Sequence, residues 1–316
     1  MEKINRFSVV LSADTNYSAH LEAVMASLLV NCSNPSCVQF YILDGGLSET
    51  NRKNISSLTR RFDSCVDFNT KTQSEYIYYR VNSNRISIAT YYRISIPDIL
   101  PEYCKTALYL DCDMIVEGDI LELAEIEFSN DEAVAAVEDI HRSPAYKLLN
   151  IPANHYFNSG MMLLNLAYWR SMGVSEKVRH FKEVHNDLLT AEDQCALNGV
   201  LWNNWKRLPP KWNQQSGMYK RRFQKKGTGY TEAEILDGVR NPKIIHYVGS
   251  RKPWKADCPH PLRNRYHFYR RYLDPAYKQP SPLEAFVAAA RSGTVRHLLK
   301  SVFSNWKIRL YAGHNQ

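Results

Sequence analysis

The chain has 316 residues, of which 44% are hydrophobic, 23% charged and 12% aromatic, and this composition excludes collagen-like, low-complexity and strongly disordered proteins. Its formal net charge of +8 hides a division: residues 1–200 carry 17 basic and 26 acidic side chains, whereas residues 201–316 carry 23 basic and 6 acidic ones. Because positive charge is concentrated in the C-terminal part, we predict that this part faces an anionic partner.

The sequence carries no sign of a membrane span or of secretion. No segment reaches the ~20 consecutive apolar residues that a membrane-spanning helix needs, and the N-terminus lacks the pattern of a signal peptide. The seven cysteines show no C-x-x-C spacing, so neither a disulfide framework nor a zinc site is indicated. These features predict a cytoplasmic protein with reduced cysteines.

Strand-like and helix-like segments alternate along the first two thirds of the chain. The expected strands lie at 7–13, 40–43, 106–110, 161–164 and 243–245. The expected helices lie at about 18–31, 85–96, 175–188 and 192–203, with a further helix that Ser48 would cap. This alternation predicts an α/β fold with a doubly wound, mostly parallel sheet and helices on both faces. The ligand crevice of such a sheet lies at the carboxyl ends of its strands.

Asp111 and Asp113 follow directly after the expected strand at 106–110. Residues two apart on an extended chain point to the same side, so we expect both carboxylates to converge at the end of the strand. Two negative charges this close are unfavourable unless a cation lies between them. The sequence therefore predicts a metal site, and a solvated turn is the alternative interpretation.

Three kinds of enzyme use such an aspartate pair. A phosphohydrolase of the haloacid-dehalogenase kind places it near the N-terminus and also uses a downstream Asp-Asp pair, which this sequence lacks after residue 193. A two-metal nucleotidyltransferase needs a third acidic ligand, for which Asp139 is the candidate. In a sugar-nucleotide transferase the pair holds one Mn²⁺ or Mg²⁺ on the donor diphosphate. This third option also accounts for the imidazole of His246 and the ammonium group of Lys252, which suit a divalent ion and phosphates.

Six motifs follow one another along the chain, at 11–17, 86–93, 108–113, 156–160, 192–198 and 246–254. In this order they resemble the family 8 retaining glycosyltransferases, especially bacterial lipopolysaccharide α-galactosyl- and α-glucosyltransferases. The resemblance covers roughly residues 5–258. It implies a GT-A nucleotide-sugar glycosyltransferase domain at 1–260, followed by a basic, aromatic-rich and partly helical region at 261–316.

The resemblance also implies a role for each matched residue. The metal ligands for Mn²⁺ or Mg²⁺ would be Asp111, Asp113 and His246. The residues that bind the donor would be Ser12, Ala13, Asp14, Asn16, Arg93, Gly249 and Lys252. The catalytic residues around the transferred sugar would be Asn158, Asp139, Asp193 and Gln194. The sequence departs from the family pattern at Cys195, where a second acid is common, and at Cys112, where a small or aliphatic side chain is usual.

The implied reaction is the metal-dependent, retaining transfer of a hexose from UDP-galactose or UDP-glucose. The acceptor would be a hydroxyl of a lipopolysaccharide-type saccharide or lipid-linked saccharide. Gln194 stands where the family places its candidate nucleophile, and an amide is a poor nucleophile. We therefore expect front-face attack, with the leaving phosphate taking the proton of the acceptor. A D-x-D phosphohydrolase and a catalytically silent nucleotide-sugar-binding protein are the alternatives.

The basic C-terminal part has three interpretations. It could dock on anionic lipids at the cytoplasmic face of the inner membrane or on a phosphorylated acceptor, through an amphipathic stretch that begins at Ser281. It could instead be an ordinary packed helix with solvated charges. The basic run at 220–226 could form a nucleic-acid patch, but no nucleic-acid motif accompanies it, so we expect no nucleic-acid partner. Trp254, inside the last motif, is the aromatic residue that we expect to stack on a sugar ring.

Overall fold

The computed structural model describes residues 6–70, 88–140, 145–185, 192–219 and 228–293. Parts of the sequence predictions lie outside these residues: the start of the helix expected at 85–96, the end of the helix expected at 175–188, the basic run at 220–226, and the amphipathic stretch beyond residue 293. In the described part, strands and helices alternate, which confirms the predicted α/β class.

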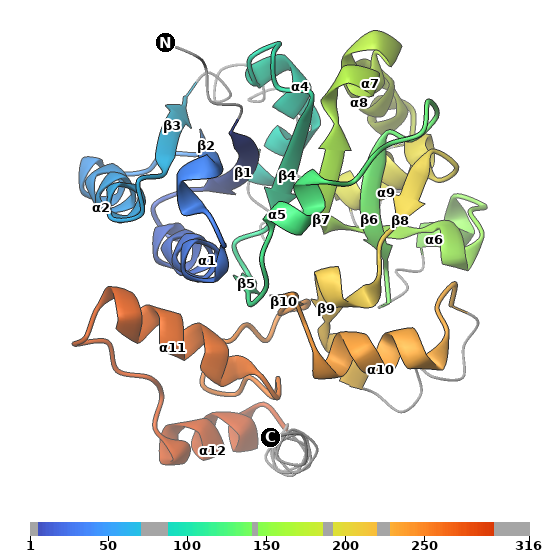
Figure 1. Ribbon diagram of the computed structural model, residues 1–316. Coiled ribbons are helices and arrows are strands. Elements are labelled where there is room, and N and C mark those ends of the chain that lie inside the picture. Colours follow the sequence, from blue (N-terminus) through green and yellow to red (C-terminus); the bar gives the residue numbers. More distant parts are fainter. Residues whose placement is uncertain (1–5, 71–87, 141–144, 186–191, 220–227, 294–316) are drawn as a thin grey trace.

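A seven-stranded sheet with the order β3-β2-β1-β4-β7-β6-β8 forms the centre of the molecule (Figure 1). Its strands are β1 (Phe7–Ala13), β2 (Val38–Asp44), β3 (Cys65–Asn69), β4 (Thr106–Leu110), β6 (Val134–Glu138), β7 (Phe157–Asn165) and β8 (Trp205–Arg207). Neighbouring strands are parallel from β3 to β4 and again between β6 and β8, whereas β7 is antiparallel to both β4 and β6. The sheet is therefore mostly parallel, as predicted.

Both faces of this sheet are buried, because successive residues of a strand point to opposite sides. In β1, Val9 and Leu11 belong to one core cluster with Leu21 and Leu28 of the first helix. Val10, between them, belongs to a second cluster. That second cluster contains apolar residues from the helices at 166–172, 174–185 and 192–201. Helices thus cover both faces, which confirms the doubly wound arrangement.

The α-helices are α1 (Ser18–Asn31), α2 (Glu49–Arg60), α4 (Ile96–Ile99), α5 (Leu121–Ala124), α6 (Ala145–Leu148), α7 (Leu166–Met172), α8 (Val174–His185), α9 (Glu192–Leu201), α10 (Glu232–Arg240), α11 (Arg263–Leu273) and α12 (Pro282–Arg291). Short 3-10 helices lie at Pro35–Cys37, Ile88–Ser95, Ala153–His155, Pro210–Asn213 and Ser216–Tyr219. Ser48 caps α2 as predicted: its Oγ accepts the backbone N–H of Asn51, whose side chain in turn accepts the N–H of Ser48.

The sequence prediction of one helix at 85–96 is wrong in its described part. A 3-10 helix at Ile88–Ser95 is followed by the short α4, which begins at Ile96. Pro97 explains the break, because proline has no N–H and fits an α-helix only in its first turn. The sequence analysis also predicted neither α10 nor α11, although Thr231 and Glu234 form a capping box at the start of α10. The buried face of α11 consists of Tyr266, His267 and Tyr269, so no aliphatic periodicity marks it.

A second, three-stranded sheet consists of β5 (Met114–Val116), β10 (Ile244–His246) and β9 (Gln214–Gln215). Strand β10 is antiparallel to β5 and parallel to β9. The register pairs His246 with Met114, the residue that follows Asp113. This pairing brings an imidazole from the C-terminal part of the chain next to the carboxylates that follow β4.

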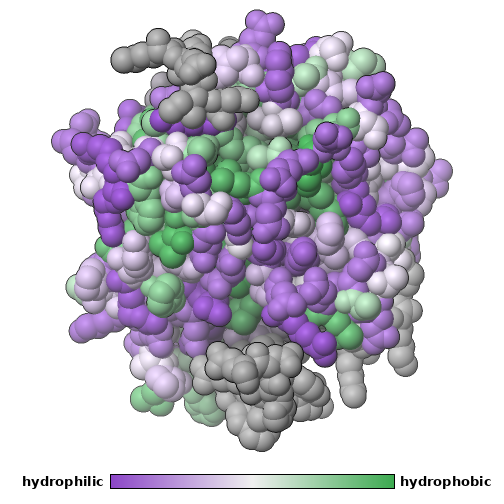
Figure 2. Space-filling view, in the orientation of Figure 1, coloured by the Kyte–Doolittle hydropathy of each residue, from purple (hydrophilic) through white to green (hydrophobic). Residues whose placement is uncertain are grey.

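Helix α11 packs against α1 and the small sheet, since Tyr266 and Tyr269 share a core cluster with Ala23 and Ile245. Figure 1 shows α11 and α12 on the side of α1 that faces away from the main sheet. Helix α12 exposes the apolar side chains of Leu283, Phe286 and Val287. Figure 2 shows apolar groups at the lower left edge, where α12 lies. Each described helix is too short or too polar to span a bilayer. The division into domains at residue 260 stays a prediction.

Candidate active site

The carboxylate of Asp111 is held at the end of β4 by groups from three directions. The backbone N–H of Asp111 donates to the carbonyl of Gly160 in the neighbouring strand β7, at 2.8 Å. Its Oδ1 accepts hydrogen bonds from the hydroxyl of Tyr109 at 2.8 Å and from Nη2 of Arg93 at 3.0 Å. The side chain keeps 27% of its surface exposed, so it remains accessible to a ligand.

Arg93 is a buried cation that connects the end of β4 to helix α9. Its guanidinium contacts Asp111 through Nη2 and Asp193 through Nε, the latter at 2.8 Å, and donates through Nη1 to the carbonyl of Ser159. Burial by itself lowers the pKa of Arg93, but the two carboxylates outweigh this effect and hold the pKa above its ordinary value. The arginine therefore stays charged and fixes both aspartates, while its predicted contact with the donor stays a prediction.

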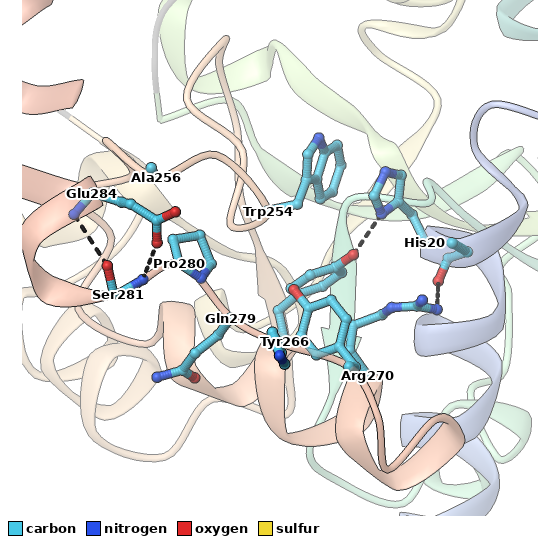
Figure 3. A pocket seen from close by; sticks show the side chains of 12 residues that line it. His20, Trp254, Ala256, Tyr266, Arg270, Gln279, Pro280, Ser281 and Glu284 are labelled. Atoms are coloured by element: carbon cyan, nitrogen blue, oxygen red, sulfur yellow. Dashed lines mark hydrogen bonds between the residues drawn. The ribbon is translucent and has the colours of Figure 1, made fainter. Parts of the chain in front are cut away.

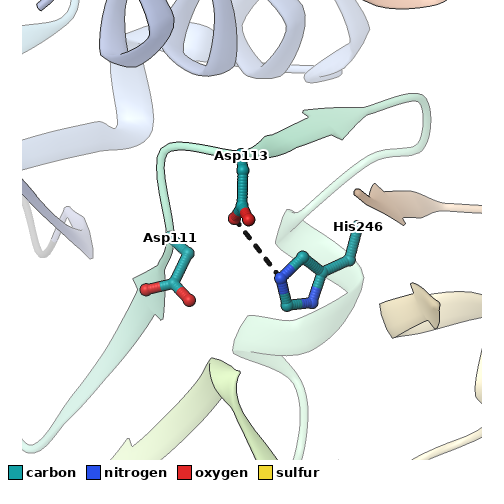
Figure 4. A group of neighbouring side chains, drawn as sticks. All are labelled: Asp111, Asp113 and His246. Atoms are coloured by element: carbon teal, nitrogen blue, oxygen red, sulfur yellow. Dashed lines mark ion pairs between the residues drawn. The ribbon is translucent and has the colours of Figure 1, made fainter. Parts of the chain in front are cut away.

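Asp113 is enclosed by His246, the last residue of β10, and by Lys252 in the loop that follows β10. Nε2 of His246 lies 3.3 Å from Oδ1 of Asp113, and Nζ of Lys252 contacts Oδ2. Figure 4 shows the Asp113 carboxylate and the His246 ring pointing toward each other, with Asp111 beside them. Burial raises the pKa of Asp113, but Lys252 and His246 together outweigh it and hold the pKa well below the usual range. Asp113 is therefore an anion in this setting.

Asp111, Asp113 and His246 each offer one ligand atom, and these atoms lie within 4.8 Å of one another. Oδ1 of Asp113 is buried and accepts no hydrogen bond from the described residues. Gly160 leaves the space open: a Cβ there would stand 2.5 Å from Cε1 of His246 and 2.8 Å from Oδ2 of Asp111. Two carboxylates and one imidazole around such a space suit a divalent ion of the Mn²⁺ or Mg²⁺ kind.

A network of side-chain amides lies beside Gly160, whose backbone N–H donates to Oδ1 of Asn158. Nδ2 of Asn158 donates to Oε1 of Gln194 at 3.2 Å, and Nε2 of Gln194 donates to Oδ2 of Asp139 at 3.1 Å. The backbone N–H of Ser159 also donates to Oε1 of Gln194, at 3.1 Å. The structure thus brings Asn158, Gln194 and Asp139 together, as the sequence predicted, and Arg93 connects Asp193 to the same region.

The predicted nucleotide-binding residues lie at the end of β1, which pairs directly with β4. The thiol of Cys112 donates to the carbonyl of Ser12 at 3.1 Å, so this edge borders the aspartate pair. Oδ1 of Asp14 accepts the backbone N–H of Tyr17, which closes the turn into α1. Ala13 and Asn16 flank Asp14 in the same segment. Their contact with a nucleotide stays a prediction.

The loop after β10 carries Gly249 and Lys252. Gly249 has a φ of +98°, a conformation that favours glycine, and it turns the chain back toward Asp113. Lys252 donates to the carbonyl of Tyr247 at 3.0 Å in addition to its contact with Asp113. Its ammonium group therefore stands beside the predicted metal ligands, where a diphosphate would lie.

Comparison with known proteins identifies the family. The family model described as "Glycosyl transferase family 8" matches residues 8–258. The chain belongs to this family. General stress protein A of Bacillus subtilis is 34% identical over 276 residues, which cover 86% of this chain and 96% of that protein. Lipopolysaccharide 1,2-glucosyltransferase of Escherichia coli is 28% identical over 262 residues, 80% of this chain and 75% of that protein.

Solved structures agree with this assignment at the level of the fold. The galactosyltransferase LgtC, in complex with donor and acceptor sugar analogues, superimposes with a TM-score of 0.72 at 24% identity. The superposition covers 86% of this chain and 98% of LgtC. The fold is therefore of the GT-A type that the family 8 resemblance implied. Membership of glycosyl transferase family 8 also sets aside a phosphohydrolase of the haloacid-dehalogenase kind.

Sequence reasoning missed several residues of this family 8 site. Asn213 is fully buried and bonded to both His246 and Asn158, yet it follows a Pro-Pro-Lys-Trp segment that carries no chemical signal. Gly160 and Tyr17 lie inside recognised motifs but received no role. The ring of Tyr17 is 45% exposed at the end of the turn that Asp14 closes.

The stacking of Trp254 on a sugar stays a prediction. One face of its indole stacks on the ring of His20, with centroids 3.6 Å apart and planes at 13°. Both rings line a cavity of about 690 Å³ with Tyr266 and Arg270 (Figure 3). Cys195, where the family often has an acid, is fully buried and accepts a hydrogen bond from Tyr156, so it belongs to the core.

Proposed function

We propose that this family 8 glycosyltransferase is a metal-dependent, retaining hexosyltransferase that uses UDP-glucose or UDP-galactose. The observation that carries the proposal is the convergence of Asp111, Asp113, His246 and Lys252 around the space beside Gly160. A Mn²⁺ or Mg²⁺ ion bound there would stabilise the negative charge that develops on the departing UDP. The sugar names come from the Escherichia coli glucosyltransferase and the galactosyltransferase LgtC.

The residues of the chain have separate tasks in this proposal. Asp111, Asp113 and His246 would hold the ion, and Lys252 would exchange its contact with Asp113 for the diphosphate. The end of β1, with Asp14 and the exposed ring of Tyr17, would bind the nucleoside. On the opposite side, Asn158, Asp139, Asp193 and Gln194 would orient the hexose so that its anomeric carbon faces the acceptor.

The arrangement of Gln194 supports front-face attack. Its Oε1 already accepts two hydrogen bonds, from Nδ2 of Asn158 and from the backbone N–H of Ser159. A carbonyl oxygen has two lone pairs, and both are used here. The amide therefore has no free lone pair to form a covalent bond with the sugar. The acceptor hydroxyl would attack from the side of the leaving phosphate, which takes its proton.

Donor hydrolysis and thermal stabilisation test this function together. Purified protein is mixed with Mn²⁺ and UDP-glucose, UDP-galactose or p-nitrophenyl phosphate. We expect Mn²⁺-dependent release of UDP and a higher melting temperature with one UDP-hexose, and no cleavage of p-nitrophenyl phosphate. Stabilisation without turnover, even with saccharide acceptors, would instead identify a silent binding protein. With an active donor in hand, NMR of the product reads the linkage and the retained anomeric configuration.

We further propose that the acceptor is a saccharide of the lipopolysaccharide type, carried by a lipid, and that the protein works in the cytoplasm at the inner membrane surface. The support is the excess of basic residues after residue 200 and the apolar side chains that α12 exposes. Flotation with vesicles containing anionic lipid compares the full chain, a chain ending at residue 280, and the full chain with Phe286→Ser. We expect flotation of the full chain alone, and equal flotation of all three contradicts the proposal.

A further inference from the structure

Three buried or half-buried amides connect His246, a predicted metal ligand, to the carboxylate of Asp139. Nδ1 of His246 lies 2.9 Å from Oδ1 of Asn213, and Nδ2 of Asn213 lies 2.9 Å from Oδ1 of Asn158. The chain continues from Asn158 to Gln194 at 3.2 Å and from Gln194 to Asp139 at 3.1 Å. Four consecutive hydrogen bonds thus join the metal side of the site to its sugar side.

Two backbone N–H groups of β7 fix the orientation of these amides. A backbone N–H can only donate, so the N–H of Ser159 requires the oxygen of Gln194, at 3.1 Å. In the same way, the N–H of Gly160 requires the oxygen of Asn158, at 3.2 Å. The nitrogen of Gln194 must then face Asp139, whose carboxylate can only accept. The orientations of Gln194 and Asn158 are therefore fixed by backbone N–H groups, which can only donate.

The orientation of Asn213 follows from that of Asn158. Because Oδ1 of Asn158 faces Asn213, the nitrogen of Asn213 must donate to it. The oxygen of Asn213 is then left facing Nδ1 of His246. If Asn213 were reversed, two oxygens would face each other in a buried setting, and the free energy cost of such an unpaired contact is large.

From this chain we infer that Asn213 is a positioning residue that fixes the tautomer of His246. Nδ1 of His246 carries the hydrogen, and Nε2 presents its lone pair to the space beside Oδ1 of Asp113. A lone pair and a carboxylate oxygen 3.3 Å apart repel each other until a cation lies between them. The part of this inference that concerns metal binding rests on the proposed function, but the tautomer does not.

All four hydrogen bonds point the same way, from His246 toward Asp139. Hydrogen bonds in such a series polarise one another. A histidine that donates its second ring N–H to an oxygen is a more basic metal ligand. Asn213 therefore has two separable functions: its oxygen orients the metal ligand, and its nitrogen orients Asn158 on the sugar side.

The tautomer is measured directly in metal-free protein by ¹H–¹⁵N NMR of ¹⁵N-histidine-labelled samples, with His246→Asn to assign the signals. At a pH where the ring is neutral, we expect Nδ1 in the range of a protonated ring nitrogen and Nε2 in the range of an unprotonated one. The opposite pattern in the wild-type protein would overturn the inference. This measurement needs neither bound metal nor activity.

Two substitutions at Asn213 separate its functions. Asn213→Asp keeps an oxygen for His246 but replaces the donor to Asn158 by an oxygen, which creates the unfavourable oxygen–oxygen contact described above. We expect the Mn²⁺ affinity, measured by electron paramagnetic resonance of free Mn²⁺, to stay near the wild-type value. The rate of UDP-hexose hydrolysis should fall by at least about tenfold. Asn213→Ala removes both contacts, and we expect Mn²⁺ affinity to fall about tenfold or more as well.

Gln214→Leu is the matched control. Gln214 is also a fully buried amide in this segment, but its side chain donates to the carbonyl of Gln215 and takes no part in the chain of hydrogen bonds. We expect it to lower thermal stability and leave Mn²⁺ affinity unchanged. If it weakens Mn²⁺ binding as much as Asn213→Ala does, the role of Asn213 is only structural. If wild-type protein binds no Mn²⁺, the proposed function fails, and the NMR signature alone supports or overturns the tautomer.

Discussion

The two sides of the site are built from different kinds of groups. On the metal side, Asp111 and Asp113 are held by the cations Arg93 and Lys252. On the sugar side, neutral amides such as Asn158 are held by backbone N–H groups of β7. Counter-ions can be exchanged for a metal and a diphosphate, whereas backbone groups cannot move without the strand. The contrast predicts that ligand binding rearranges the charged side and leaves the amide side as a fixed template.

Asp113→Asn tests the charged side and has the largest expected effect. It removes one of two converging charges and the partner of Lys252, while the size of the side chain is kept. We expect Mn²⁺-dependent UDP-hexose turnover to fall by at least about 10³-fold, because charge stabilisation of the leaving group is lost.

The matched control is Asp119→Asn, a substitution in the turn after β5, where Asp119 accepts the backbone N–H of Leu121. We expect this variant to keep its activity, and both variants to give cooperative melting curves. Full metal-dependent activity of Asp113→Asn would refute the assignment of the metal site.

Gly160→Ala tests the strand that both sides share. The added Cβ would meet His246 at 2.5 Å and Asp111 at 2.8 Å, so these two ligands must move apart. Displacements of this size cost about 10² in rate. We expect weaker Mn²⁺ binding and a turnover about 10²-fold lower, measured by paramagnetic resonance and UDP release. Unchanged Mn²⁺ affinity would show that the metal lies elsewhere.

Lys252→Met sharpens the contrast between exchangeable and fixed groups. It removes the cation that competes for Asp113, so we expect Mn²⁺ alone to bind more tightly. Turnover should nevertheless fall about tenfold, because the diphosphate loses its ammonium partner. Mn²⁺ titration and steady-state kinetics measure the two effects separately. If both quantities fall together, Lys252 is a structural partner of Asp113 and does not exchange.

The smallest expected effect is a pH dependence of stability, and it comes from outside the site, where α1 packs against α11. Burial lowers the pKa of His20 to about 4 and that of His267 to about 4. In the unfolded chain these two histidines bind protons below a pH of about 6.5, whereas in the folded protein they stay neutral until about pH 4. The free energy of unfolding should therefore be highest above pH 6.5 and decrease as the pH falls toward 4.

Urea unfolding at pH 7.5 and pH 5 measures this decrease. His20→Gln should make it smaller, because one of the buried histidines that resist protonation is gone. The same decrease in the variant and the wild type would show that other groups dominate the acid sensitivity.

Four strands of the main sheet, β1, β2, β4 and β7, were predicted from sequence because they contain continuous apolar runs, whereas β3, β6 and β8 were not predicted. The predicted ranges 7–13 and 18–31 have the same first and last residues as β1 and α1. The small sheet was predicted only in part: a strand was expected at 243–245, within one residue of β10, whereas β9 has two residues, too few for any periodicity. Yet this sheet places His246 opposite Met114, so the geometry of the site depends on pairing between distant segments.

The candidate site was predictable where a motif carried it and unpredictable where only packing did. Asp111, Asp113 and His246 were named from the sequence, and the structure brings them together. Asn213 has no motif, and its importance comes from two contacts that only the folded chain creates. Arg93 was expected at the donor, but its burial between two carboxylates could not be read from its neighbours in sequence.

The contact between Lys252 and Asp113 has a consequence for the protein outside its catalytic cycle. A buried carboxylate left without a partner destabilises a fold by several kcal/mol, roughly 3–5. Here the chain supplies its own cation, so departure of metal and UDP leaves no uncompensated charge. Chelation should therefore stop turnover and leave the protein folded, with the melting temperature falling only by the amount that ligand binding had added. If the proposed metal site is correct, the chain would stay folded whatever the metal supply of the cell, and its activity would respond to that supply.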